Sequence, residues 1–156
     1  MPADENKALA RRLYEEVFQQ GNLDAADALL ASDFINHIPV PGAPPLRGTE
    51  GIKRFAAAIL AAFPDHELLL EDQIAERDRV VSHWTIRGTQ TGPLTLPNLP
   101  TIPPSGKRFE MTEIRIDRIA DGRIAESWFV YDRLGWLQQL GALSSLAAAA
   151  QRVQPT

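Results

Sequence analysis

The stretch Lys107–Asp132, KRFEMTEIRIDRIADGRIAESWFVYD, decides the fold. Its apolar residues recur at about every second position, which is the spacing of a β-strand that packs one face against a core. Asp121-Gly122 lies in the middle of the stretch, and this dipeptide favours a tight hairpin turn. The sequence therefore predicts a long antiparallel hairpin with strands over Lys107–Ile119 and Arg123–Asp132.

Other strands are predicted on the N-terminal side of this hairpin. Residues 66–76 and 78–91 alternate in the same way, and the second stretch is rich in Val, Thr, Ile and Trp. A proline-rich loop over residues 92–106 separates them from the hairpin. A shorter strand over residues 34–38 is stopped by the prolines that follow it. Period-2 segments thus fill the second half of the chain.

Helical spacing of apolar residues dominates the first third of the chain. It predicts helices over residues 4–20, 24–30 and 49–63. A last short helix over residues 134–140 closes at Gly141, and the Ala-rich tail after it is expected to dock loosely. Helices followed by long antiparallel strands predict an α+β fold. In it, a curved, mostly antiparallel sheet wraps around the N-terminal helices and leaves an internal cavity.

Length and composition exclude several classes of protein. The 156 residues favour one domain, and a net charge of −4 without a basic block argues against a nucleic-acid partner. The chain has no cysteine, and its three histidines lack the spacing of a zinc site, so neither metal nor cofactor is expected. No apolar run approaches the ~20 residues of a membrane span, and the chain does not begin like a signal peptide. We therefore expect a cytoplasmic protein without a membrane partner.

Two carboxylates share one face of the last predicted strand. Strict alternation places Glu126 and Asp132 on the side of Trp128, although parity alone does not say whether that side faces inward. A carboxyl in such an apolar setting has a raised pKa and can move protons near neutral pH. The structural alternative is that Asp132 caps the final helix and Glu126 pairs with a surface arginine.

Further candidates lie on the other strands. His37 belongs at the rim or wall of the cavity, either as a functional group or as an ordinary structural histidine. Glu113 shares its parity with Phe109, so it either projects into the interior or is a solvated charge. Trp84 and Trp128 either line a pocket or fill the core, and Gln90 continues the side of Trp84.

The assembled motifs resemble the SnoaL-like polyketide cyclase (ester cyclase) family of the nuclear-transport-factor-2-like superfamily. The resemblance covers about residues 5–141 and implies a single domain over residues 1–156, with residues 142–156 as a loosely ordered tail. It also implies a cone-shaped α+β barrel with a deep cavity and a homodimer formed through the sheet. The motifs that carry it are FINH at 34–37, GTQTG at 88–92, PSGK at 104–107, and RIADGRIAESWFVYD at 118–132 running into LQQLG at 137–141.

By this resemblance, cyclases of the family close a ring of a polyketide methyl ester by intramolecular aldol condensation, without metal or cofactor. The resemblance implies that Asp132 is the acid/base and that His37 hydrogen-bonds substrate oxygens. Many relatives have histidine where this chain has Gln90, and glutamine cannot titrate. The candidate substrate-binding residues are Phe34, Trp84, Gln90, Glu113, Glu126 and Trp128.

The predicted function is that of a cofactor-independent lyase or isomerase that acts on a hydrophobic, carbonyl-bearing small molecule. A first alternative is an epoxide hydrolase- or isomerase-type enzyme on the same scaffold, which an interior Asp–Arg–Asp relay would favour. A second alternative is a non-catalytic ligand-binding or dimerisation module. Use of Asp132 purely as a helix cap would favour that module, whereas Asp132 and His37 facing one open pocket would favour the enzyme.

Overall fold

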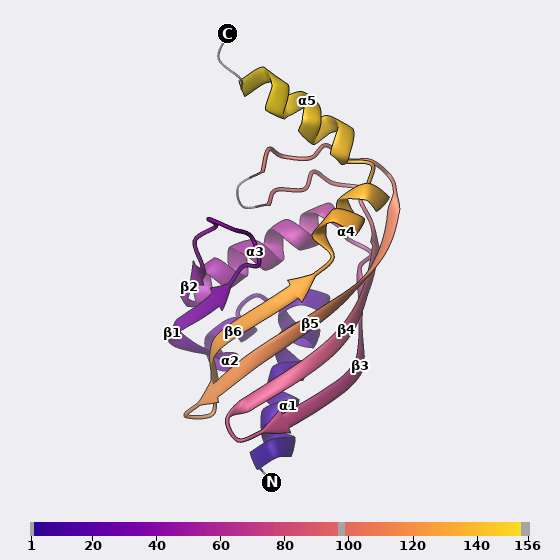
Figure 1. Cartoon of the computed structure of the whole chain (residues 1–156). Coiled ribbons are helices and arrows are strands. Elements are labelled where there is room, and N and C mark those ends of the chain that lie inside the picture. Colours follow the sequence, from indigo (N-terminus) through magenta and orange to yellow (C-terminus); the bar gives the residue numbers. More distant parts are fainter. Residues whose placement is uncertain (1, 97–98, 154–156) are drawn as a thin grey trace.

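The computed structural model describes residues 2–96 and 99–153, and it has a curved sheet on one side and helices on the other (Figure 1). The helices are α1 (Pro2–Arg12), the π-helical η1 (Leu13–Gln19), α2 (Ala25–Leu29), α3 (Gly48–Ala62), α4 (Arg133–Gln139) and α5 (Leu143–Val153). The strands are β1 (Leu30–His37), β2 (Leu46–Arg47), β3 (Glu67–Glu76), β4 (Arg79–Thr89), β5 (Arg108–Ala120) and β6 (Arg123–Tyr131). The predicted α+β class is confirmed.

The six strands form one sheet in the order β2-β1-β6-β5-β4-β3. All neighbouring pairs of strands are antiparallel except the pair of β1 and β6, which is parallel. Asp121 and Gly122 join β5 to β6 with φ angles of 53° and 72°, the left-handed conformations that a two-residue hairpin turn requires. The predicted hairpin is therefore present, and its strands supply most of the site described below.

A β-bulge in β6 sets which side chains face inward. Next to the turn, Ile119 pairs with Ile124, but the following pair is Arg118 with Glu126, so Ala125 is the extra residue. Strict alternation breaks at this point. As a result Ile124 is buried on the same side of the sheet as Ser127, Phe129 and Tyr131, while Glu126 and Trp128 lie on the opposite side.

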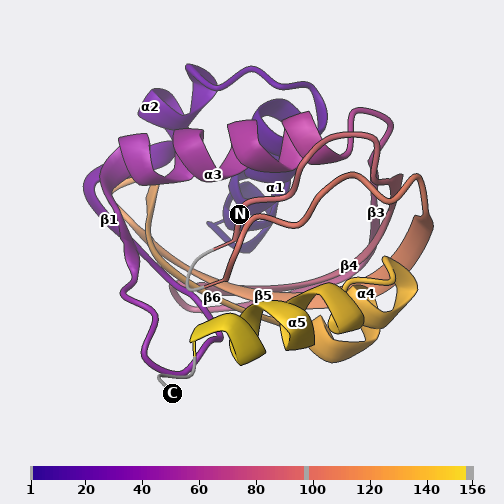
Figure 2. The same cartoon turned by 90° about the horizontal axis from the view of Figure 1, so that it is seen from above.

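Helices α1, α2 and α3 cover the concave side of the sheet (Figure 2). Helix α3 lies across the sheet with Ile52 and Ala56 fully buried, as its apolar stripe predicts. Leu13 and Val17 of η1 are fully buried as well. The core therefore lies between these helices and β3–β6, and one end of this interface is left as a pocket.

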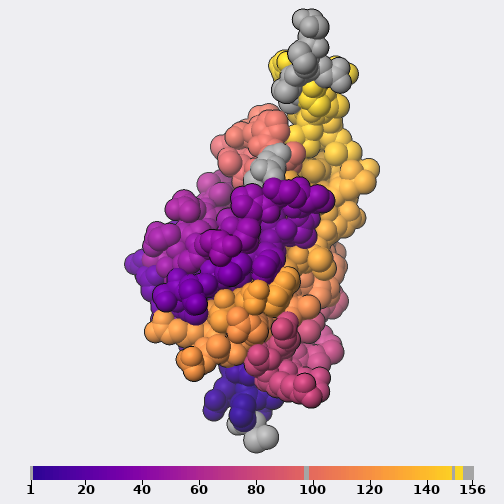
Figure 3. Space-filling view, turned by 60° about the vertical axis from the view of Figure 1, so that its left-hand side comes forward, coloured from indigo at the N-terminus to yellow at the C-terminus, as the bar shows by residue number. Residues whose placement is uncertain are grey.

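The tail differs from its predicted form, because residues Leu143–Val153 fold into the helix α5. Alanine has the highest intrinsic helix propensity, and four consecutive alanines lie in this segment. Leu143 and Leu146 pack against the core, and beyond them α5 extends past the body of the molecule (Figures 1 and 3). Residues 154–156 of the predicted tail lie outside the described residues. None of the described helices is long and apolar enough to cross a membrane.

Candidate functional site

The principal pocket lies between the helices and the concave face of the sheet, and its wall is mainly aromatic. Alternate residues of β5 from Phe109 to Arg115 line it, which spans about 20 Å of strand. Its aromatic wall is formed by Phe18, Phe55, Phe63, Phe109, Phe129 and Trp136. The polar side chains that line it are Tyr14, His66, Glu113, Arg115 and Tyr131. Such a pocket suits a hydrophobic ligand that carries a few oxygen atoms.

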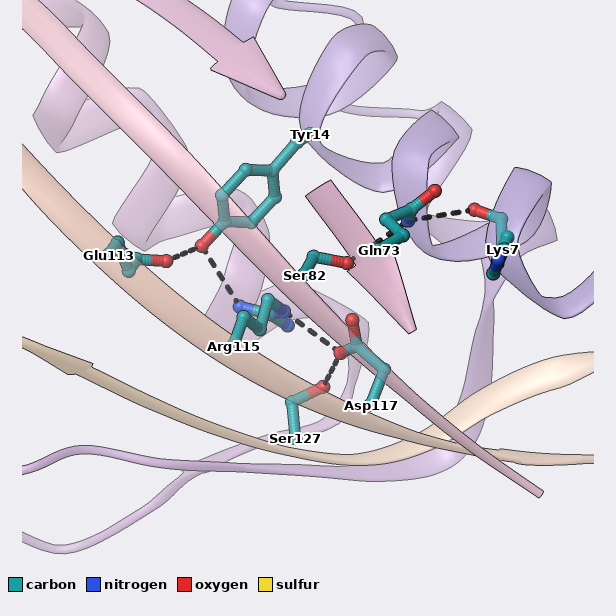
Figure 4. A network of polar contacts seen from close by, with 8 residues as sticks. All are labelled: Lys7, Tyr14, Gln73, Ser82, Glu113, Arg115, Asp117 and Ser127. Carbon is teal, nitrogen blue, oxygen red and sulfur yellow. Dashed lines mark hydrogen bonds and ion pairs between the residues drawn. The ribbon is translucent and has the colours of Figure 1, made fainter. Parts of the chain in front are cut away.

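Glu113 is the acidic side chain of this pocket. It is 6% exposed, and the hydroxyl of Tyr14 donates a hydrogen bond to its Oε1 (Figure 4). Burial raises the pKa of Glu113 from 4.5 to about 7, while Arg115 lowers it and Asp117 raises it to smaller extents. Near neutral pH this carboxyl therefore exists in both protonation states, as a group that accepts and returns a proton must.

The charge of Arg115 is already compensated by Asp117. Arg115 Nε lies 2.8 Å from Asp117 Oδ1, the two side chains are 2% and 0% exposed, and the Ser127 hydroxyl donates to the same oxygen (Figure 4). Arg115 Nη1 also lies 3.4 Å from the Tyr14 hydroxyl oxygen. Arg115 lies near Glu113 but is already paired with Asp117. The rise in the pKa of Glu113 caused by desolvation is therefore larger than the decrease caused by Arg115.

Asp132 does not face this pocket, so its predicted placement in an enclosed cavity is wrong. Its side chain is exposed and caps α4, with Oδ1 accepting a hydrogen bond of 2.9 Å from the backbone N–H of Gly135. It borders a second, more polar hollow, and Met111 and Trp136 line both hollows. The strand ends at Tyr131, and the carboxylate serves the helix terminus instead.

His37, Glu126 and Trp128 lie together on the outer face of the sheet, contrary to their predicted place at the cavity. His37 Nε2 is 2.8 Å from Glu126 Oε1, and Arg118 Nε donates to Glu126 Oε2 at 3.2 Å. The ring of His37 stacks on Trp128 at 5.1 Å. The hydrogen bond from His37, with a smaller effect from Arg118, lowers the pKa of Glu126. The bulge explains this outward placement, and the pairing of Glu126 with a surface arginine is the structural alternative given above.

Phe34, Trp84 and Gln90 are buried without lining the pocket. Phe34 is 0% exposed in the core, and Trp84 packs against the ring of Tyr14 at 4.7 Å. Gln90 Nε2 lies 3.1–3.3 Å from the carbonyl oxygens of Gly92, Ile102 and Pro103, which ties the proline-rich loop to the end of β4. Gln90 therefore holds the loop in place and does not line the pocket. Within the described ranges, Glu113 is the sole predicted site residue that lines it.

Four polar residues of the pocket were missed by the analysis of the sequence, and one of them, His66, has both ring nitrogens bonded to backbone carbonyl oxygens. Arg115 continues the alternation that singled out Glu113, so the same parity could have identified it. Tyr14 belongs to a helical stripe that indicated only a core residue. Tyr131 became an inward residue only through the bulge in β6. Among the residues that the structure describes, no group of three or more His, Asp or Glu side chains could hold a metal ion.

Comparisons with known proteins agree with this architecture. A family model described as SnoaL-like polyketide cyclase matches residues 8–140. Aklanonic acid methyl ester cyclase DnrD of Streptomyces peucetius is 28% identical over 134 residues, which cover 85% of this chain and 88% of DnrD. The solved structure of TsrD from Streptomyces laurentii is 32% identical, with a TM-score of 0.72 over 87% of this chain and 97% of TsrD.

The fold itself is shared more widely. An NTF2-like protein from Burkholderia pseudomallei K96243 is 18% identical, and its structure covers 87% of this chain and 97% of its own with a TM-score of 0.69. That likeness concerns the fold alone, and it agrees with the predicted α+β architecture of helices on a curved sheet. The family model spans most of the chain, so the predicted family is confirmed as well. The chain belongs to the SnoaL-like polyketide cyclase family.

Proposed function

We propose that this chain is a cofactor-independent acid/base enzyme in which Glu113, rather than Asp132, carries the proton. The observation that supports this role is a buried carboxyl with a pKa of about 7, held by Tyr14 at the wall of an aromatic pocket. Asp132 is exposed and already bonded to the first turn of α4. A proton carrier must lie within hydrogen-bond reach of a bound substrate, and of the two carboxyls it is Glu113 that lines the aromatic pocket.

The proposed reaction is an intramolecular aldol-type cyclisation. Ionised Glu113 removes a proton from the carbon next to a substrate carbonyl, and the electrons of that C–H bond form an enolate. The enolate carbon then attacks a second carbonyl of the same molecule and forms a C–C bond. The resulting alkoxide takes back the proton that Glu113 holds, so the substrate is isomerised without any other reactant. Tyr14 keeps the carboxyl in place throughout.

The lining of the pocket supports a flat, hydrophobic, carbonyl-bearing substrate. Aromatic rings offer stacking surfaces on several sides, and the acid lies midway along the part of β5 that borders the pocket. DnrD is an aklanonic acid methyl ester cyclase, and DauD of Streptomyces sp. (strain C5), which is also 28% identical over 134 residues, carries the same description. We therefore take aklanonic acid methyl ester as the first test compound for this chain.

The test is the substitution Glu113→Gln, which keeps the shape of the side chain and removes its titration. Glu110→Gln is the matched control, because Glu110 lies on the same strand, is exposed and forms a surface ion pair of 2.6 Å with Arg87. We expect Glu113→Gln to lower kcat for ring closure by about 100-fold or more and the control to stay near the wild type. Activity of Glu113→Gln within about twofold of the wild type would refute the role.

A second candidate function is hydrolysis, for instance of an epoxide. Glu113, Arg115 and Asp117 follow one another along one face of β5, which approaches the Asp–Arg–Asp relay that would favour a hydrolase, with glutamate in the first position. Product mass separates the two functions, because cyclisation leaves the mass unchanged and hydrolysis adds one water. Binding of the ester by the wild type without turnover would instead favour the non-catalytic module. The capping role of Asp132 also favours that module.

We also propose that the outer face of the sheet forms a homodimer interface. Ile74, Val81, Ile116 and Trp128 are neighbours in register across β3 to β6 and form an apolar row on this face. Ile74 is 64% exposed and Val130, on the same face, is 58% exposed. An apolar face of this kind on a sheet is a surface that a second copy can cover.

A further inference from the structure

Tyr131 places a second phenol beside Glu113. It is the last residue of β6, and in the register of the hairpin it lies directly opposite Glu113. Both side chains line the pocket. Side chains of directly opposed residues are close neighbours, with Cβ atoms about 5 Å apart. Glu113 and Tyr131 therefore border the same part of the pocket.

The ring of Tyr131 is held by two aromatic neighbours. It stacks on Phe129 at 5.8 Å with an interplanar angle of 3°, and it meets Trp136 edge-on at 5.7 Å and 81°. Packing on two sides limits rotation of the ring and fixes the direction of its hydroxyl. A donor that is positioned before the substrate arrives needs little reorganisation during the reaction.

The two phenols beside Glu113 differ in how their hydroxyls are used. The hydroxyl of Tyr14 donates to Glu113 and lies 3.4 Å from Arg115 Nη1. Within residues 2–96 and 99–153, the Tyr131 hydroxyl has no hydrogen-bond partner. Its oxygen is also not fully buried. Burial is the main cause that raises the pKa of Tyr131, so the phenol keeps its proton and remains a donor.

We propose that Tyr131 is the oxyanion donor of the site: its hydroxyl donates a hydrogen bond to the substrate carbonyl oxygen while Glu113 removes the proton from the adjacent carbon. This inference rests on the proposed function and adds to it the group that stabilises the enolate. As the C–H bond breaks, its electrons form the C=C bond of the enolate and the carbonyl π electrons move onto oxygen. The proton goes to Glu113, and Tyr131 keeps its own proton while its hydrogen bond strengthens.

The test compares Tyr131→Phe with Tyr14→Phe, since both changes remove one hydroxyl and keep the ring. With aklanonic acid methyl ester as the probe, we expect Tyr131→Phe to lower kcat by about 100-fold and to change KM by less than about threefold. In the same variant the pKa of Glu113, followed by carboxyl ¹³C NMR, is expected to stay at about 7. Tyr14→Phe is expected to raise that pKa, because it removes a hydrogen bond to the ionised form.

Two results would overturn the role of Tyr131. The first is a kcat of Tyr131→Phe within about twofold of the wild type. The second is a change in the pKa of Glu113 as large as that in Tyr14→Phe, which would show that Tyr131 acts through Glu113 instead of on the substrate.

The experiment separates this inference from the proposed function. If Glu113→Gln is inactive and Tyr131→Phe is active, the proposed function stands and the oxyanion donor is refuted. If Glu113→Gln is active, the proton carrier is wrong, and the kcat of Tyr131→Phe still decides whether its hydroxyl takes part. If the wild type binds the ester without turning it over, both roles are refuted for this compound, because neither Glu113 nor Tyr131 then acts on a reaction. A wild type that does not bind the ester refutes both.

Discussion

Replacing Glu113 with glutamine is expected to remove a penalty that this carboxyl imposes on the fold above neutral pH. The side chain is 6% exposed, and burial raises its pKa from 4.5 to about 7. The folded protein therefore holds this proton more tightly than the unfolded chain. Below pH 4.5 the titration of Glu113 does not change the free energy of unfolding. As the pH rises from 4.5 towards about 7 it lowers that free energy, and above about 7 the loss stays constant.

The size of this penalty follows from the same pKa values. The interval from 4.5 to about 7, at about 1.4 kcal/mol for each pKa unit, corresponds to roughly 3 kcal/mol. Glutamine has no charge to desolvate, and its carbonyl oxygen can still accept the hydrogen bond of Tyr14. Relative to the wild type, Glu113→Gln is therefore expected to gain roughly 3 kcal/mol between about pH 4.5 and about pH 8.

Urea denaturation at a series of pH values measures this difference, because the free energy of unfolding extrapolates linearly to zero urea. Taking the difference between variant and wild type removes the titration of every group that the two proteins share. Glu110→Gln is the control, and its difference from the wild type should stay nearly constant because Glu110 is exposed. A difference for Glu113→Gln that is the same at about pH 5 and about pH 8 would contradict the desolvated state of this carboxyl.

Three other substitutions test the remaining assignments. Asp132→Ala is expected to lower the free energy of unfolding by about 1 kcal/mol through loss of the cap on Gly135, with kcat retained, and a kcat loss like that of Glu113→Gln would return the catalytic role to Asp132. Arg115→Met leaves Asp117 buried without its cation and is expected to cost about 3–5 kcal/mol in urea denaturation, so a loss under about 1 kcal/mol would refute the buried pair. Val130→Lys is expected to convert the proposed homodimer into monomers in light scattering, and an unchanged mass would place the interface elsewhere.

The elements of this fold could be predicted because their signals are local. Alternation along the chain indicated the strands, the apolar stripe of residues 49–63 indicated α3, and Asp121-Gly122 indicated the hairpin. The helix over the Ala-rich tail was the exception, although its composition carried the propensity for it. Local signals, however, do not say which face of a strand meets which helix.

The site could be predicted only in part, because one extra residue in β6 reverses which of its side chains point towards the pocket. Counting outward from the turn without a bulge would pair Glu113 with Val130, whereas the structure pairs it with Tyr131. The bulge at Ala125 therefore turns Tyr131 towards Glu113 and Trp128 towards the outside. Both faces of β6 carry large apolar side chains, so hydrophobicity gave no means of detecting the slip. Glu113 was found because β5 alternates without interruption across the pocket.

The buried pair of Arg115 and Asp117 also bears on which forms of a ligand the pocket accepts. Asp117 balances the charge of Arg115, so the pair offers a ligand no net positive charge, although Arg115 Nη2 has no hydrogen-bond partner among the described residues. A free carboxylic acid would arrive ionised and would have to lose its hydration beside Glu113, and the pair of Arg115 and Asp117 supplies no net positive charge to offset that cost. Masking the same acid as an ester removes that cost. We therefore expect the pocket to bind the esterified form of such a ligand more tightly than its free acid.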